Sequence, residues 1–147
     1  MATITAVNGA RTVLTSTGFS TLASATYIAT SAYTTAGELD VIIEVTAATT
    51  NTPAGNFQVV VFATASLDGT NYQSGPVSGT TATDEGDLTY LGVLPVNTTA
   101  TTERKTFSLF NAFGYVPYSF KVVLKNDLGV ALTSGTVYTS AITGSAV

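Results

Sequence analysis

Apolar residues recur at every second position in several short segments of this chain. Successive side chains of a β-strand point to opposite faces, so this period of two predicts strands with one buried face. Segment 39–47 shows the pattern clearly, with Leu39, Val41 and Ile43 on the face expected to be buried. No stretch sustains the period of 3.6 residues that marks an amphipathic helix. The chain is therefore predicted to be all-β.

Seven or eight short strands are expected from residue 36 onward, separated by Gly, Asn, Asp or Pro. A single sheet would leave an apolar face in water, so we predict a two-sheet antiparallel sandwich, either jelly-roll or immunoglobulin-like. Residues 1–35 hold few large apolar side chains and are predicted to be an N-terminal arm or edge strands, with a short helix near 21–30 as an alternative. Residues 36–147 are predicted to be the sandwich domain. The expected strands are 39–47, 57–65, 88–94, 105–110, 118–125, 130–133 and 136–142.

Two of these strands allow their faces to be assigned. In 57–65, Val60 and Phe62 lie opposite the other apolar residues, so both faces are expected to be covered, at the centre of a sheet or beneath a neighbouring subunit. In 118–125 the alternation predicts one inward and one outward set. The inward set is Tyr118, Phe120, Val122 and Leu124, and the outward set is Ser119, Lys121 and Lys125.

Charged side chains are scarce. They make up 10% of the residues, against about 25% in an average soluble domain. A folded monomer of 15.0 kDa should expose roughly 7,000 Å², which leaves about 500 Å² for each charged side chain. Threonine makes up about a fifth of the chain. We therefore expect an exterior covered by hydroxyl groups and, in part, by neighbouring subunits.

Several function classes are disfavoured by the residues that are missing. The chain has no histidine and no cysteine, the residues that most often serve as general base, nucleophile partner or transition-metal ligand. A net charge of −4 without a basic cluster argues against nucleic-acid binding. No long apolar block and no secretory signal is recognised, so neither a membrane partner nor export is expected. The sequence predicts a protein that is not an enzyme and holds no cofactor.

Carboxylates offer three weak candidate sites. Asp84, Glu85 and Asp87 lie close together and would suit a hard cation such as Ca²⁺, although a solvated turn explains them equally. Asp68 belongs to a predicted chain reversal at residues 66–72, where turn geometry accounts for it. A pair of acids on segment 39–47, at positions 40 and 44, lacks the cleft that glycoside hydrolysis needs.

Aromatic residues gather in and around the loop 111–118. Exposed tyrosines stack on sugar rings or anchor protein contacts, whereas buried rings close the end of a sandwich core. Both roles stay open from the sequence. The candidates for an interface or a glycan site are Tyr72, Phe113, Tyr115 and Tyr118.

Three segments carry a resemblance to a known group of proteins. They are 65–72 (ASLDGTNY), 91–97 (LGVLPVN) and 107–127 (FSLFNAFGYVPYSFKVVLKND). Together they resemble small β-sandwich virion proteins of tailed bacteriophages, including capsid decoration or cement proteins, over roughly residues 56–142. The resemblance implies a protein made in the host cytoplasm and located on the virion surface. It also implies a homotrimer that clamps the major capsid protein or other virion proteins.

Two other functions remain open at this point. One is a tail, neck or baseplate component with the same fold. The other is a carbohydrate-binding sandwich for host adsorption, in which Tyr72, Tyr115 or Tyr118 stacks on sugars.

Overall fold

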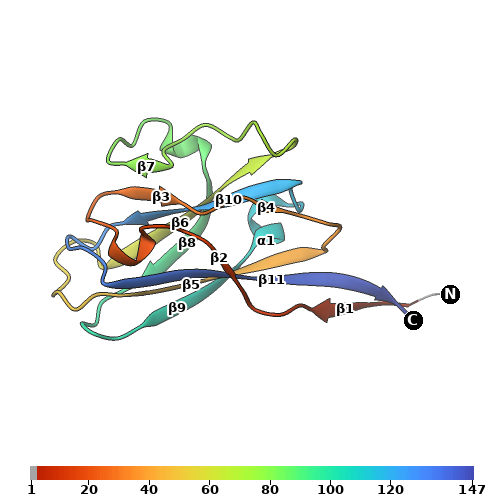
Figure 1. The fold of residues 1–147 in the computed structure, drawn as a ribbon, viewed down its shortest axis with the longest axis horizontal. Coiled ribbons are helices and arrows are strands. Elements are labelled where there is room, and N and C mark those ends of the chain that lie inside the picture. Colours follow the sequence, from red (N-terminus) through yellow and green to blue (C-terminus); the bar gives the residue numbers. More distant parts are fainter. Residues whose placement is uncertain (1–2) are drawn as a thin grey trace.

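The computed structural model describes residues 3–147 as two antiparallel β-sheets packed face to face (Figure 1). This confirms the predicted all-β sandwich. The first sheet contains β1 (Ile4–Asn8), β2 (Thr12–Leu14), β5 (Asp40–Ala48), β9 (Glu103–Ser108) and β11 (Ser134–Ala146). The second contains β3 (Tyr27–Ala29), β4 (Tyr33–Thr34), β6 (Gln58–Ser66), β7 (Ser78–Gly79), β8 (Thr89–Pro95) and β10 (Ser119–Asn126). The helical elements are two 3₁₀ turns, η1 (Phe19–Thr21) and η2 (Glu85–Asp87), and the short helix α1 (Leu109–Phe113).

The strand order decides between the two topologies left open by the sequence. In the first sheet β2, β11, β5 and β9 lie in that order, and in the second sheet β3, β10, β6 and β8 do. These eight strands therefore pair first with last, second with seventh, third with sixth and fourth with fifth. This nested pairing, in which a long hairpin is rolled into two sheets, is the jelly roll.

The main core lies between the two sheets. Its largest fully buried side chains include Phe120 from β10 and Ile43 from β5, which face each other across the sandwich as the period of two predicts. The N-terminal segment also contributes, because Phe19 of η1 is completely buried in this core. Strands β1 to β4 all come from the first 35 residues, of which residues 1 and 2 lie outside the described part.

A second, smaller core covers the outer face of the second sheet. Val60 and Phe62 of β6 are buried there with Leu88, which follows η2. Strand β6 lies between β10 and β8, so its position is central and its second face is covered by the chain's own segment before β8. Of the two explanations offered by the sequence, the central position is the one found.

A buried asparagine ties the loops at one end of the sandwich together. The Nδ2 group of Asn126 donates to the carbonyl oxygens of Leu22 and Val130, each at 2.8 Å. Its Oδ1 accepts from the backbone N–H of Leu128 at 2.9 Å. Asn126 is fully buried, so these three bonds replace secondary structure where two loops meet the end of β10.

Five details of the sequence prediction are wrong. Leu39, expected on the buried face of segment 39–47, lies just before β5 and is 49% exposed. Residues 109 and 110 belong to α1 and not to a strand, because the Ser108 side chain accepts from Asn111 N–H and Gly114 ends the helix in the left-handed conformation. Segment 130–133 is a loop whose backbone bonds go to Leu22 and Ala48. No helix occupies 21–30, which holds β3 instead. Tyr118 is half exposed and Ser119 is buried, the reverse of the predicted faces.

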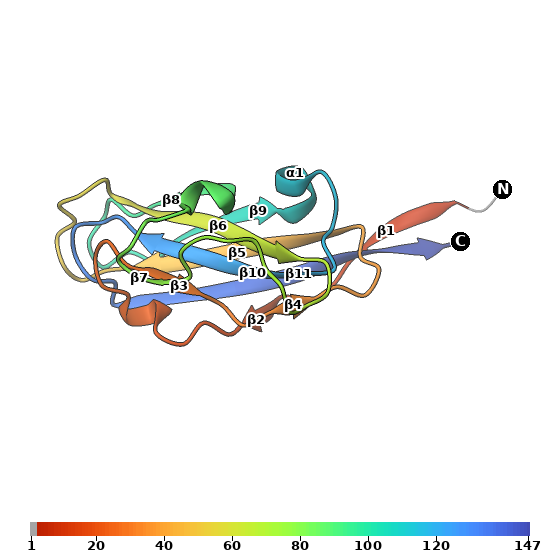
Figure 2. The same ribbon diagram turned by 90° about the horizontal axis from the view of Figure 1, so that it is seen from above.

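Strand β11 is 13 residues long, and its last four residues, 143–146, extend beyond the end of β5. They pair with β1 alone, in a ladder that runs from Ile4 with Ala146 to Asn8 with Ile142. This two-stranded ribbon projects from one end of the molecule (Figures 1 and 2). Every residue of β1 is exposed.

Candidate functional site

A tight loop at residues 66–72, which follows β6, forms one wall of the candidate site. Asp68 organises this loop: its Oδ1 accepts from the backbone N–H groups of Thr70 and Asn71, both at 2.8 Å, and its Oδ2 accepts from Asn71 Nδ2 at 2.7 Å. Ser66 donates its hydroxyl to the same carboxylate at 2.9 Å. The predicted reversal at 66–72 is confirmed by the bridge between Ser66 and Tyr72.

These bonds also fix the charge of Asp68. The backbone N–H of Asn71, followed by that of Thr70, holds the pKa of this carboxyl far below its usual range. An acid with so low a pKa stays ionised at neutral pH and does not supply a proton. The structure therefore gives Asp68 a turn-forming role, as the sequence indicates.

Tyr72 is held firmly at the base of the loop. Its hydroxyl lies 2.8 Å from Ser119 Oγ, and the ammonium group of Lys121 lies 4.4 Å from the centre of its ring. Burial of Ser119 follows from this contact and from its bond to the carbonyl oxygen of Tyr33 at 3.0 Å. The ring of Tyr72 is thus positioned by β10 on one side and by the 66–72 loop on the other.

A pocket of about 450 Å³ opens between this loop and the segment after α1. Tyr115 forms the far wall with its ring 48% exposed, and Phe113 supports it edge to face at 5.7 Å. The sequence did not single out Leu67 or Gln73, which also line the pocket. An 83% exposed Leu67 in a polar turn is the signal that could have pointed to it. The pocket residues are Ala65, Ser66, Leu67, Asp68, Asn71, Tyr72, Gln73 and Tyr115.

The four aromatic candidates therefore divide. Tyr72 and Tyr115 share the pocket, and Phe113 lies behind Tyr115 against the core. Tyr118 does not line the pocket, although its ring reaches within 3.4 Å of the position a Cβ would take at Gly69. Two rings and an exposed leucine line the pocket beside amide groups and the ionised carboxylate of Asp68, whose oxygens are bonded to its own loop. The pocket suits a ligand with a flat apolar face and hydrogen-bonding groups, such as a sugar ring or a partner's side chain.

One acid of segment 84–87, Glu85, is engaged in contacts within the chain. Lys125 Nζ lies 3.0 Å from Glu85 Oε2, and the hydroxyl of Tyr27 donates to the same oxygen. Within residues 3–147 no group of three or more acidic side chains is arranged to hold a metal ion. Glu85 instead attaches η2 to β10 and β3, which holds the covering segment on the second sheet.

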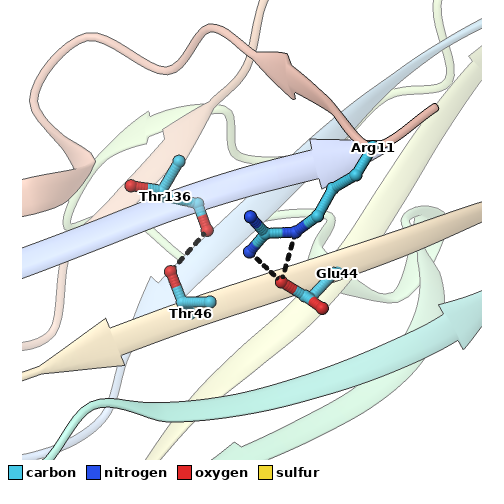
Figure 3. A network of polar contacts seen from close by, with 4 residues as sticks. All are labelled: Arg11, Glu44, Thr46 and Thr136. Carbon is cyan, nitrogen blue, oxygen red and sulfur yellow. Dashed lines mark hydrogen bonds and ion pairs between the residues drawn. The ribbon is translucent and has the colours of Figure 1, made fainter. Parts of the chain in front are cut away.

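The acids of β5 are also engaged in structural contacts. Arg11 binds Glu44 through its Nε at 3.0 Å and through Nη2 (Figure 3). Its guanidinium also lies over the ring of Tyr138 at 3.3 Å. The bond to Glu44 raises the pKa of Arg11 above its ordinary value. Asp40 accepts from Ser108 Oγ at 2.5 Å and from Phe110 N–H at 2.8 Å, which anchors α1.

No protein-family model, curated protein or solved structure matches this chain. Among the residues that the structure describes, none belongs to a helix with the length and apolar character needed to cross a bilayer.

Proposed function

We propose that this chain is a virion structural protein, a capsid decoration or cement protein that oligomerises on a phage head and stabilises it. The observation that carries the proposal is its nearly uncharged exterior. The surface of 7212 Å² is shared by 14 charged side chains, or about 500 Å² each. Such a surface suits a subunit that works among neighbours, because burying it removes few ions from water.

Most of the few acids are already bound within the chain. Six of the nine accept hydrogen bonds from its own groups, namely Glu38, Asp40, Glu44, Asp68, Glu85 and Asp127. These carboxylates hold loops and strands in place, and two of them, Glu44 and Glu85, are paired with Arg11 and Lys125. A rigid, sparsely charged shape is what repeated docking on a lattice needs.

The fold is compatible with this role. Jelly rolls are common in viral capsid and lectin domains. Because one fold serves many functions, this agreement is an analogy and adds to the resemblance carried by residues 65–72, 91–97 and 107–127.

The stabilising mechanism is additive contact. One weak interface gains strength when an oligomer touches several capsid subunits, because the second contact forms at a high effective concentration. A protein that binds the assembled shell and not its separated subunits stabilises the shell by mass action.

The proposal is tested on undecorated shells of the phage whose genome encodes this chain. Co-sedimentation should show saturable binding, and bound shells should withstand higher temperature than bare ones. Bovine serum albumin at equal concentration is the control for nonspecific protection. Shells that neither bind the chain nor gain heat resistance would refute the cement role, and electron microscopy of labelled particles would then test the tail, neck or baseplate alternative.

The pocket favours carbohydrate binding as a second candidate function. Tyr72 and Tyr115 line the pocket beside the amides of Asn71 and Gln73 and the carboxylate of Asp68, and such a mix of aromatic and polar groups suits a sugar ring. The test is a glycan array with the wild-type chain and Tyr115→Ala. Tyr90→Ala is the matched control, because Tyr90 is equally exposed but packs on Phe62 outside the pocket. No signal with wild type, or equal signals with all three, rules this function out.

A further inference from the structure

The projecting ribbon has two open backbone edges. Thr3 and Val147 exchange backbone hydrogen bonds at 3.0 and 3.3 Å, and Gly9 N–H donates to the Ala141 carbonyl at 2.7 Å. Bonding residues alternate along an antiparallel ladder, so the backbone groups of Ile4, Ala6 and Asn8 point away from β11. They form the first open edge.

The second open edge belongs to β11. Its Ile142 carbonyl accepts from Leu39 N–H at 2.7 Å, just before β5 begins at Asp40. The backbone groups of Gly144 and Ala146 point to the same side of β11 as those of Ile142, but β5 does not extend beside them, and no other strand of the described residues does. The ribbon thus offers unpaired N–H and C=O groups on both sides, and a two-stranded ribbon alone is only marginally stable in water.

The other sheet edges carry features that block further pairing. Strand β9 has Glu103, Arg104 and Lys105 in sequence, β8 has Pro95 and a register shift opposite Val61 and Phe62, and β7 has only two residues. Charges, proline, irregular register and short length are the usual protections of an edge. Strand β1 has none of them, since its sequence is ITAVN with a regular register.

The two faces of the ribbon also differ in a way that a monomer does not explain. Residues paired across the ribbon share a face, so one face contains Ile4, Ala6, Asn8, Ile142, Gly144 and Ala146. The other face contains Thr5, Val7, Thr143 and Ser145. The first face is apolar except for Asn8, whereas the second is mainly hydroxylated. This pattern is typical of a ribbon with an inside and an outside.

The ribbon carries free edges on both β1 and β11, so a second copy of the same chain can pair with it, and the charge of the ribbon permits this. Two copies each carry a net charge of −4 and repel one another where their acids meet. The ribbon has no ionised side chain from Thr3 to Ala10 or from Leu128 to Val147. Identical chains therefore approach here without placing like charges side by side.

We propose that three copies associate through this ribbon, with the free edge of β1 in each copy pairing with the free edge of residues 143–146 in the next. A two-fold pairing of β1 with β1 would leave the β11 edge open, whereas a ring closes both edges. Three ribbons make six antiparallel strands. Because an eight-stranded barrel is just wide enough to be filled by side chains, a six-stranded ring has room for fewer large ones. Small residues on this face, Ala6, Gly144 and Ala146, leave space for the larger Ile4 and Ile142.

This inference deepens the proposed function, on which it rests for the role of the trimer, by naming the self-association surface. Its test is independent of any shell. Native mass spectrometry of the purified full chain should give about 45 kDa, three times 15.0 kDa. A monomer or a dimer as the final state overturns the ring.

Two proline variants locate the contact. Ala6→Pro removes an outward N–H without breaking the β1–β11 ladder, so it should give monomers with an unchanged circular dichroism spectrum. Val13→Pro is the matched control, because Val13 has the outward parity on β2, beside the same strand but on the body of the sandwich. It should remain trimeric. Ala6→Pro that stays trimeric overturns the proposal.

Hydrogen exchange on the wild-type chain decides the matter even if Ala6→Pro fails to fold. The amides of Ala6 and Gly144 should exchange at least about tenfold more slowly than in an unstructured peptide, as the internally bonded amide of Thr5 does. Fast exchange at Ala6 and Gly144 beside a protected Thr5 overturns the proposal. A trimer with these protections that leaves shells unprotected would instead refute only the cement role.

Discussion

Replacing the buried Asn126 by alanine should destabilise the sandwich more than any other single amide substitution. Asn126→Ala removes three side-chain hydrogen bonds, those to the carbonyls of Leu22 and Val130 and from the N–H of Leu128. Each such bond contributes about 1 kcal/mol net, and a buried partner left unpaired adds a penalty of about 1–3 kcal/mol. Since relaxation admits water to some of these groups, we expect a loss of about 3–5 kcal/mol.

A loss of this size is a large part of the total. Domains of this length have about 5–15 kcal/mol of stability in all, and 1 kcal/mol shifts the midpoint of thermal unfolding by about 3 °C. The variant should therefore melt about 10–15 °C below wild type. Urea titration followed by far-ultraviolet circular dichroism measures the free energy of unfolding, with an unchanged slope expected because the folded surface is the same.

Two further variants sharpen this test. Asn51→Ala is the matched control, because Asn51 is exposed and its side chain donates one long bond of 3.5 Å to Ala131; it should cost less than about 0.5 kcal/mol. Asn126→Asp sets an acceptor against two carbonyl oxygens, so it should be worst at neutral pH and recover when the acid is protonated. A loss below about 1 kcal/mol for Asn126→Ala would refute the reasoning.

Three other outcomes follow from the structure. Gly129→Ala should lower the free energy of unfolding more than Gly37→Ala does, as measured by urea titration. Both glycines have positive φ, but a Cβ at Gly129 would lie 2.7 Å from the backbone of Gly55, whereas Gly37 has open space around it. Equal losses of stability would contradict this. Asp68 has a folded pKa below its unfolded value of about 3.9, so its contribution is present above that pH and is lost as the pH falls toward the folded pKa. The stability gap between wild type and Asp68→Asn should therefore persist from pH 7 to 5 and shrink below pH 4, and a pH-independent gap would count against the role of the turn. Because Lys125 already pairs with Glu85, millimolar Ca²⁺ should leave the melting temperature unchanged, and a rise reversed by chelator would reinstate the cation site.

The strands with a clear period of two were predictable, and the exceptions have local causes. Segments 39–47 and 57–65 coincide with β5 and β6 within one residue, because burial on one or both faces dictates their composition. The alternation of polar and apolar residues in 105–110 predicts a strand, although α1 begins at Leu109. The helix forms there because Ser108 caps its first turn and Gly114 ends it. Such short-range hydrogen bonds override a pattern that rests on side-chain polarity alone.

Other misses came from contacts between distant segments. Tyr118 has the inward parity but lies just before β10 begins, and Ser119 is buried because the hydroxyl of Tyr72 and the carbonyl of Tyr33 meet it. The pairing of Ile4–Asn8 with the end of β11 joins residues more than 130 positions apart, and small uncharged residues give no register signal in the sequence. The pocket shares this origin, since Leu67 and Tyr115 come together only through the fold.

The length of β11 has a mechanical consequence. A pull on the ribbon along its axis is transmitted through a continuous strand into its contact with β5, where nine residue pairs from Ser134 to Ile142 lie side by side. Tension in that direction shears all these hydrogen bonds at once and does not peel them apart one by one. The sandwich should therefore resist a pull along the ribbon axis more strongly than a pull across the strands.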